Sequence, residues 1–287
     1  MTRLHFAASA LICSTLLAPA SAGVTFGPVR GQPGKSVRLV SHSETPGGTI
    51  ERTVNDKTSK GKITITRDRD LVWTFRAPMA DGTKRGMVRV SKLTTTTKIV
   101  IGGKEEKTTD DSKLTGKMFA MSKTPTGEWK FELDGAVPYT SSANEIEELK
   151  VYLKREWFPE HEVSLRDSWE FDPAWVKMMI EKDLEKAQTL GTMSLRQIRH
   201  TEKFQIAVAD VSIRSTGEDY QSDGSQTSAS VELAGQVSVN LNTMLDEMLD
   251  IKGTITTSAS KPGESTKIIL PVHLTVTKSF VTDGPTP

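Results

Sequence analysis

Runs of β-forming residues recur about every ten positions, and they constrain the fold more than any other feature of this chain. Ile63-Thr64-Ile65-Thr66 alternates apolar and polar residues, and Leu71-Val72-Trp73-Thr74-Phe75 follows after a polar turn. Alternation with a period of two places one face of a strand in a core and the other in water. Comparable runs follow at 87–90, 98–101, 117–121 and 129–133. Short, evenly spaced strands predict an antiparallel sheet built as a sandwich or a half-open barrel.

Two amphipathic helices are predicted to interrupt the strands. An apolar stripe over 142–158 begins with the Ser-x-x-Glu spacing of a capping box. In the second helix Asp172 is a suitable N-cap, Pro173 occupies the first helical position, and Gly191 is expected to end the helix. The sequence therefore predicts a mainly β (α+β) protein, in which two antiparallel β-sheet halves are bridged by two amphipathic helices.

Strand-forming runs resume at Gly191 and continue to Phe280, so a second β half is expected after the helices. Leu114–Met118 and Leu233–Val237 each follow a polar stretch and precede a strand. The two halves are therefore either a duplication or two sets of hairpins that are alike by chance. We expect the following organisation: a signal peptide at 1–22, an N-terminal β half at 23–140, a helical connector at 141–191, a C-terminal β half at 192–282 and a disordered tail at 283–287.

The first 22 residues have the three parts of a secretory signal peptide. Arg3 is their only charged residue, an apolar core spans Phe6–Leu17, and Ala20-Ser21-Ala22 provides small residues for a signal peptidase. The apolar core is too short for a membrane anchor, which needs roughly 20 apolar residues. Lipidation at Cys13 is disfavoured because the bulky Ile12 precedes it. We therefore expect cleavage after Ala22 and a periplasmic or secreted protein.

Composition excludes several classes of partner and site. Removal of Arg3 with the signal peptide leaves 36 basic residues (37 − 1) against 36 acidic ones, a neutral balance that argues against nucleic acid as a partner. Cys13 is the only cysteine, so the mature chain can form neither a disulfide nor a thiolate metal site. The mature chain also contains no apolar run of membrane-spanning length, so a soluble protein without a transmembrane segment is expected.

Motifs for catalysis, cofactors and metals are not apparent. His42, His161, His200 and His273 have no spacing typical of metal ligands, and no Gly-x-Ser-x-Gly element is present. The segment 219–224 lacks the alternating ligands and the closing Glu of a calcium loop. We therefore expect no metal and no cofactor, and a non-catalytic protein is favoured. A hydrolase whose carboxylates converge only in three dimensions stays open.

Aromatic residues concentrate around the predicted second helix. Trp157, Phe158, Trp169, Phe171 and Trp175 fall within nineteen positions. One interpretation is a core seam where the helices cover a sheet. The other is an aromatic wall of a pocket for an apolar ligand, with methionines that adapt to irregular shapes nearby. On the second interpretation the candidate ligand-binding residues are Trp157, Trp169, Trp175, Met178 and Met179.

The segment Pro159…Val163-Ser164-Leu165-Arg166-Asp167-Ser168-Trp169 resembles the Pro…Val-x-x-Gly-Asp-Ser-Trp element of uncharacterised exported bacterial proteins with a domain of unknown function. The resemblance covers about 158–280 and includes the strand-turn-strand pattern from Gly235 to Thr254. This chain has Arg166 where the family usually has Gly. The resemblance implies a β-rich envelope protein and assigns no catalytic residue. Physically, the element predicts a strand end at which Trp169 packs inward and Asp167 satisfies a turn.

The leading functional hypothesis is an exported, soluble, non-catalytic protein that binds an apolar small molecule or an envelope protein. The alternative is a structural or protein–protein interaction module of the cell envelope. In that alternative the Thr-rich strand around Lys92–Lys98 would offer an edge for pairing with another chain.

Overall fold

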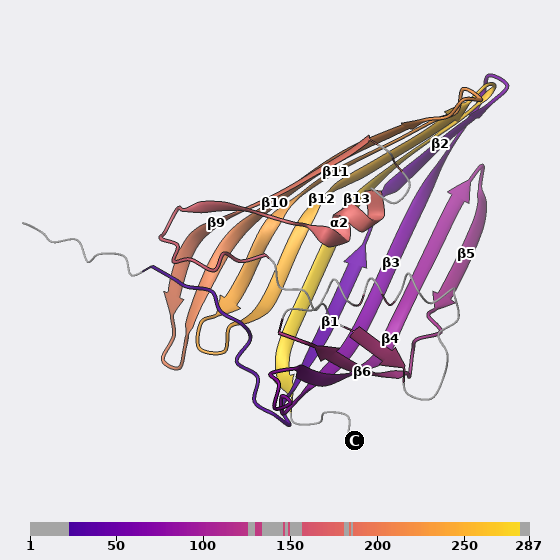
Figure 1. Ribbon diagram of the computed structural model, residues 1–287. Helices are drawn as coiled ribbons and strands as arrows, with labels where there is room; N and C mark the ends of the chain where they lie inside the picture. The colour runs from indigo at the N-terminus through magenta and orange to yellow at the C-terminus, as the bar shows by residue number, and fades with distance from the viewer. Residues whose placement is uncertain are drawn as a thin grey trace, which may run out of the picture.

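The computed structural model describes residues 23–125, 130–133, 157–180 and 186–281, together with positions 146, 149 and 184; of Leu133 and of residues 178–180 it describes the backbone alone. Most of these residues belong to one antiparallel sheet of 13 strands. Figure 1 shows the long strands side by side in a strongly twisted sheet that curves around a short helix. The mainly β prediction is confirmed.

The strands before the helix make one side of the sheet. They are β1 (Ser36–Glu44), β2 (Gly48–Val54), β3 (Lys57–Arg76), β4 (Lys84–Ile101), β5 (Lys104–Asp111), β6 (Met118–Lys123) and β7 (Lys130–Leu133). The strands that flank or follow the helix make the other side. These elements are β8 (Ser168–Phe171), α2 (Ala174–Ile180), β9 (Lys186–His200), β10 (Gln205–Tyr220), β11 (Gln226–Asn240), β12 (Leu245–Lys261) and β13 (Glu264–Val281).

The two sides form one sheet rather than the two halves that the sequence predicted. The strand order is β7-β6-β4-β3-β1-β13-β12-β11-β10-β9-β8, so the first strand lies between β3 and the last strand. Ser36 to Glu44 of β1 pair without interruption with Val281 to His273 of β13. Beyond the end of β1, β2 takes its place between β13 and β3. β5 pairs with the C-terminal half of β4. The pairing of β1 with β13 makes a single continuous core possible.

Tight turns join the long hairpins. Asn55 and Asp56, between β2 and β3, both have positive φ, at 48° and 63°. Gly102 and Gly103, between β4 and β5, have φ of 57° and 79°. Positive φ at both central residues is the requirement of a type I′ hairpin, whose twist matches that of the flanking strands. The strand-forming run at 98–101 is confirmed as the end of β4.

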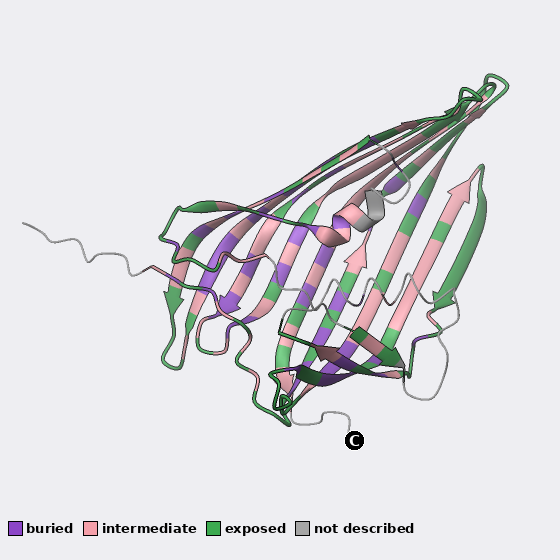
Figure 2. Ribbon diagram, in the orientation of Figure 1, coloured by how far each residue is buried: buried purple, intermediate pink, exposed green. Residues whose placement is uncertain are grey.

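One face of the sheet holds the core, and we call it the inner face. Val37, Leu39 and Leu71 are among its fully or almost fully buried residues, and Val176 of α2, which is 0% exposed, belongs to the same cluster. The segment before β1 adds Val24, which makes an isolated antiparallel bridge with Val163. Figure 2 shows that the buried residues gather in one half of the sheet, which we call the base half. The other half, which ends at the β2–β3 and β12–β13 turns, is the distal half.

The prediction of two amphipathic helices that bridge two sheets is not supported. The second helix begins after Asp172 and Pro173 as expected, but α2 has only seven residues, and β9 begins at Lys186. Gly191 therefore lies within a strand. A Cβ at this position would stand 2.8 Å from the Phe171 ring, so the glycine makes room for that side chain rather than capping a helix. The first predicted helix, 142–158, falls almost entirely outside the described residues, as do the proposed signal peptide and the tail.

Candidate ligand-binding site

The predicted aromatic cluster forms at the base half of the inner face. The rings of Trp157 and Phe171 lie 5.3 Å apart between centroids, and Trp169 donates a hydrogen bond from Nε1 to the Trp157 carbonyl oxygen at 2.8 Å. Phe26, which the sequence did not single out, joins them: its ring lies 4.6 Å from that of Phe158 and 5.9 Å from that of Trp169. Trp169 and Phe171 pair with β9 through Met193 and Gly191, which places both aromatic rings over the sheet.

These aromatic side chains pack mainly against one another and against the core. Trp157, Trp169 and Trp175 are half-buried and contact the core cluster. Met178 and Met179 lie on the last turn of α2, and their side chains are outside the described part of the structure. The geometry is that of a packed seam, in which Trp157 and Trp169 make tilted ring contacts that stabilise the fold.

The turn before Trp169 has the expected form. Asp167 accepts a hydrogen bond at Oδ2 from the Ser164 backbone N–H at 2.7 Å, and Ser164 in turn accepts one from the Asp167 N–H at 3.0 Å. Arg166 has a φ of 76°, a left-handed conformation that favours glycine.

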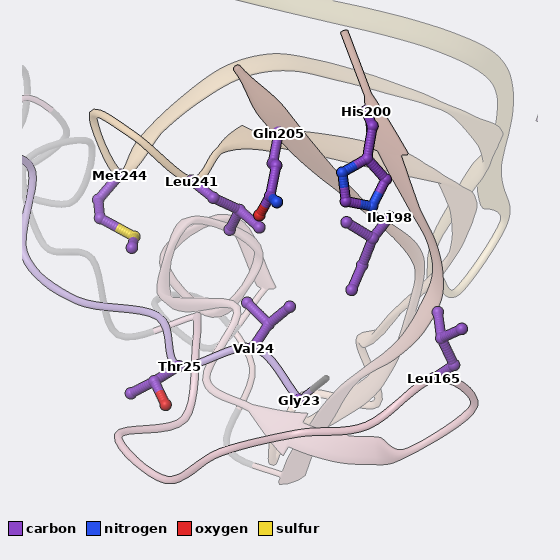
Figure 3. Close-up of a pocket in the computed structure, with 9 residues that line it drawn as sticks. All are labelled: Gly23, Val24, Thr25, Leu165, Ile198, His200, Gln205, Leu241 and Met244. Carbon is purple, nitrogen blue, oxygen red and sulfur yellow. The ribbon is translucent and has the colours of Figure 1, made fainter. Parts of the chain in front are cut away.

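A half-open pocket of about 420 Å³ lies beside the N-terminal segment (Figure 3). Its lining is mostly apolar and includes one histidine and one glutamine; the lining residues are Gly23, Val24, Thr25, Leu165, Ile198, His200, Gln205, Leu241 and Met244. None of the three tryptophans lines it, and no carboxylate of the described residues does. The pocket is therefore distinct from the predicted aromatic site.

A larger apolar surface lies on the inner face of the distal half. Residues directly opposite each other in an antiparallel pair project from the same face. Val231 pairs with Ile255, Ile255 with Leu270, and Ile63 with Ile99. Gly48 connects the two series: it pairs with Ile63, and a Cβ on it would meet the Leu270 side chain at 3.0 Å. An unbroken apolar row thus crosses β11, β12, β13, β2, β3 and β4.

The next row toward the tip repeats this arrangement. Ile268 pairs with Ile50, Ile50 with Gly61, and Gly61 with Ile101. We call the two rows the distal trough, which consists of Val231, Ile255, Leu270, Ile63, Ile99, Ile268, Ile50 and Ile101. Val231 and Ile63 are buried and the other six are half-buried. Figure 2 colours most of this part of the sheet as intermediate.

The outer face of the same strands is mainly polar. Lys62 and Thr64 flank Ile63, and Thr254 and Thr256 flank Ile255. Such a surface suits water, and an apolar inner face suits a nonpolar partner or a core. The alternation of Ile with Thr or Lys was visible in the sequence, but the assignment of each isoleucine to the inner face required the strand register.

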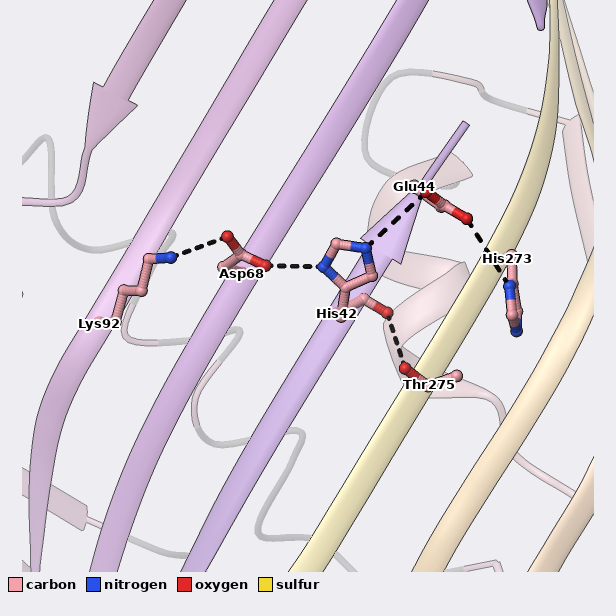
Figure 4. A network of polar contacts seen from close by, with 6 residues as sticks. All are labelled: His42, Glu44, Asp68, Lys92, His273 and Thr275. Carbon is pink, nitrogen blue, oxygen red and sulfur yellow. Dashed lines mark hydrogen bonds and ion pairs between the residues drawn. The ribbon is translucent and has the colours of Figure 1, made fainter. Parts of the chain in front are cut away.

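A network of charged side chains crosses the outer face at mid-height (Figure 4). Asp68 accepts hydrogen bonds from Lys92 Nζ at 2.8 Å and pairs with His42 Nδ1 at 2.7 Å. Glu44 lies 3.9 Å from ring nitrogens of both His42 and His273. Hydrogen bonds from Lys92 and His42 lower the pKa of the Asp68 carboxyl below its ordinary value. The network continues to Asp250, which lies 2.9 Å from His273 Nε2.

This network has the character of surface ion pairing. Its side chains stand on an open sheet face and do not line the pocket of Figure 3. Among the described residues, no group of three or more His, Cys, Asp or Glu is placed to hold a metal ion. No helix in the described part of the chain is long and apolar enough to cross a membrane.

The predicted free edge at Lys92–Lys98 is not an edge. β5 pairs with Thr94 to Ile101, and β6 pairs with Lys84 to Arg89 on the same side of β4. The sequence missed this because a short, charged strand such as β5 has no apolar alternation: all eight of its residues are exposed. The edge at this side of the sheet belongs instead to β5 beside the C-terminal half of β4 and to β7 beyond β6.

Comparisons with known proteins identify no family. No family model and no curated protein matches the chain. Among solved structures, the chain is similar at 10% identity and a TM-score of 0.12 to the secretin InvG in a near-atomic resolution cryo-EM structure of the Salmonella SPI-1 type III secretion injectisome. The similarity covers 88% of this chain and 66% of that one. In an atomic model of the basal body proteins InvG, PrgH and PrgK, it covers 88% and 47%. This chain thus spans less than two thirds of either match, and such a TM-score does not indicate a shared fold.

Proposed function

We propose that this chain is a non-catalytic binding protein for an apolar ligand, which it holds along the distal trough. The observation that carries the proposal is the unbroken apolar row from Val231 to Ile99, which is half-buried over most of its length and lies on one face of six neighbouring strands. Large continuous apolar surfaces on a folded protein are typical of binding sites.

Energetics support a ligand with a hydrocarbon chain. Each buried methylene contributes about 0.8 kcal/mol, so ten methylenes in contact with the trough would contribute about 8 kcal/mol before the cost of ordering the ligand is subtracted. The trough offers side chains of similar size, mostly isoleucine, from β11 to β4; beyond Ile99 and Ile101 the two rows end at Glu106 and Lys104 of β5. This uniform surface fits a flexible aliphatic chain better than a ligand that requires directed hydrogen bonds.

We also propose that the protein acts outside the cytoplasm after cleavage behind Ala22. The arrangement of the N-terminal signal, the apolar core and the small residues supports export. Gly23 lies against the Glu162 side chain, and Val24 makes a bridge with Val163, so the segment after the proposed cleavage site is anchored to the fold. The resemblance of 158–280 to exported bacterial proteins agrees with this compartment.

The test compares two neighbouring residues of β4. Ile99 lies in the trough, and Val100 projects from the opposite face of the same strand. We expect the wild type to enhance the fluorescence of N-phenyl-1-naphthylamine, an apolar probe, and Ile99→Ser to bind it several-fold more weakly. Val100→Ser serves as the matched control and should bind as the wild type does. Equal loss in both variants, or no enhancement by the wild type, would contradict the proposal. Native mass spectrometry of the exported protein would reveal a co-purifying ligand directly.

An interaction module of the envelope is the second candidate. The specific feature in its favour is the β5 edge, but that strand reads Lys-Glu-Glu-Lys-Thr-Thr-Asp-Asp and is exposed throughout. Charged residues on an edge strand discourage pairing with another chain. We therefore rank this function below ligand binding.

A further inference from the structure

Two arginines stand on the inner face between the distal trough and the base core. Arg67 pairs with Ser43 of β1 on one side and with Thr95 of β4 on the other. Arg69 pairs with Ser41 and Leu93 one row closer to the base. Ile65 and Ile63 follow Arg67 along β3 toward the tip at every second position, so Arg67 stands on the same face at the end of the trough.

Arg67 differs from the cations on the outer face at the same level. There, Arg38 pairs with Asp70 at 2.5 Å and Lys92 with Asp68 at 2.8 Å. The exposed side chain of Arg67 forms no hydrogen bond or ion pair with any residue that the structure describes. The nearest inner-face carboxylate on this side is Asp110 of β5, which pairs with Thr95 of β4. It therefore lies two strands from β3, about 10 Å from the β3 backbone.

We infer that the trough binds a single-chain anionic amphiphile, with its hydrocarbon chain along the isoleucine rows and its carboxylate or phosphate head at Arg67. This inference rests on the proposed function and assigns a class to its ligand. The guanidinium presents a planar set of donors that matches both kinds of head group. The hydroxyls of Ser43 and Thr95 flank it on the same face and add further donors.

The length of the site agrees with this class of ligand. Arg67 and Gly61 are six residues apart on β3, which corresponds to about 20 Å along the strand. A lipid chain in one leaflet spans about 15 Å, half of the hydrocarbon thickness of a bilayer. One acyl chain therefore fits between Arg67 and the row of Ile50 and Ile101, short of the charged tip where Arg52 pairs with Glu264 at 2.6 Å.

The experiment measures displacement of bound N-phenyl-1-naphthylamine from the full exported protein by hexadecanoate, by a lysophosphatidate of the same chain length and by the neutral hexadecanol. We expect at least one of the two anions to compete at about tenfold lower concentration than the alcohol, since hydrogen bonds to charged groups are the stronger ones. The two anionic arms distinguish a carboxylate from a phosphate head. Sodium chloride should weaken competition by the anions and leave competition by the alcohol unchanged.

In Arg67→Gln the anions should displace the probe only at the concentration that the alcohol needs. The alcohol should displace it as it does from the wild type. Arg214→Gln is the matched control, because Arg214 is an exposed arginine on the outer face of β10. Equal competition by anions and alcohol in the wild type would overturn the inference and leave apolar binding intact. An equal loss for all competitors in Arg67→Gln would also overturn it, because it would indicate a structural role. Failure of the probe to bind the wild type would instead defeat the proposed function itself.

Discussion

Val37 of β1 stands directly opposite Phe280 of β13, and both project from the inner face. The partners come from the two ends of the chain, yet they share a core with Trp73 of β3, which pairs with Val37 on its other side. A disturbance of β1 should therefore affect both sides of the sheet in one cooperative transition.

Leu39→Ala tests this expectation at the next inner-face position. The Leu39 side chain is 0% exposed, and its loss should lower the free energy of unfolding by about 3 kcal/mol. Val40 follows it on the outer face and is 41% exposed, so Val40→Ala should change stability by about 0.5 kcal/mol at most. Urea unfolding followed by circular dichroism provides both values. Similar costs for the two variants would contradict the assignment of faces.

Arg166→Gly should stabilise the protein. A non-glycine residue in the left-handed region is strained by roughly 1–2 kcal/mol, which glycine would relieve. The greater flexibility of glycine in the unfolded chain offsets part of this stabilisation. We expect a net increase of about 0.5 kcal/mol in the free energy of unfolding, visible as a higher Tm. Arg166→Ala retains the strain and is the control. A decrease in Tm for the glycine variant would mean that the Arg166 side chain contributes more than its backbone costs.

Gly191→Ala should destabilise the protein by about 2 kcal/mol, since the new methyl group would overlap the Phe171 ring and its carbonyl oxygen, both 2.8 Å away. The same substitution in a Phe171→Ala background should cost clearly less, because the ring is then absent. A double-mutant cycle by thermal unfolding measures the difference. Additive effects of the two substitutions would argue against a direct clash.

Asp68 should make stability depend on pH. Its carboxyl pKa is lowered in the folded state by Lys92 and His42, so its contribution is present above the ordinary pKa of 3.8 and is lost as pH falls through the folded value. Because the side chain is 36% exposed, Asp68→Asn should cost only about 0.5 kcal/mol at neutral pH. The gap to the wild type should close as pH falls from 3.8 through the lowered pKa of the folded state. A gap that widens in acid would contradict this sign.

The local elements were predictable from the sequence, whereas the pairing between distant strands was not. The alternation in Ile63–Thr66 and the glycines at 102 and 103 determine a strand and a turn from neighbouring residues alone. The pairing of β1 with β13 depends on two segments that carry no mark of each other in the sequence. Gly191 shows how local rules can mislead. They predict that it ends a helix, but it lies in a strand and makes room for Phe171.

The site followed the same division. Trp157 and Trp169 were expected to lie in one cluster, and they are hydrogen-bonded, because only twelve positions separate them in the sequence. Phe26 was missed, since its contact with Phe158 joins segments more than 130 residues apart. The distal trough was missed for a related reason: a row such as Val231, Ile255 and Leu270 exists only after three strands have found their register.

The meeting of β1 with β13 also sets an order of assembly. Ribosomes synthesise a chain from its N-terminus, so β1 must wait for a partner that lies 243 positions later, from Val37 to Phe280. Contacts of such long sequence separation form slowly. Until Val281 has been delivered, one side of β1 is an unsatisfied edge and the apolar rows are divided between two incomplete sheets. The nascent protein is therefore most vulnerable to aggregation just before synthesis is complete. The eighteen residues of β13 are the last to pair, and their pairing joins the two parts of the sheet.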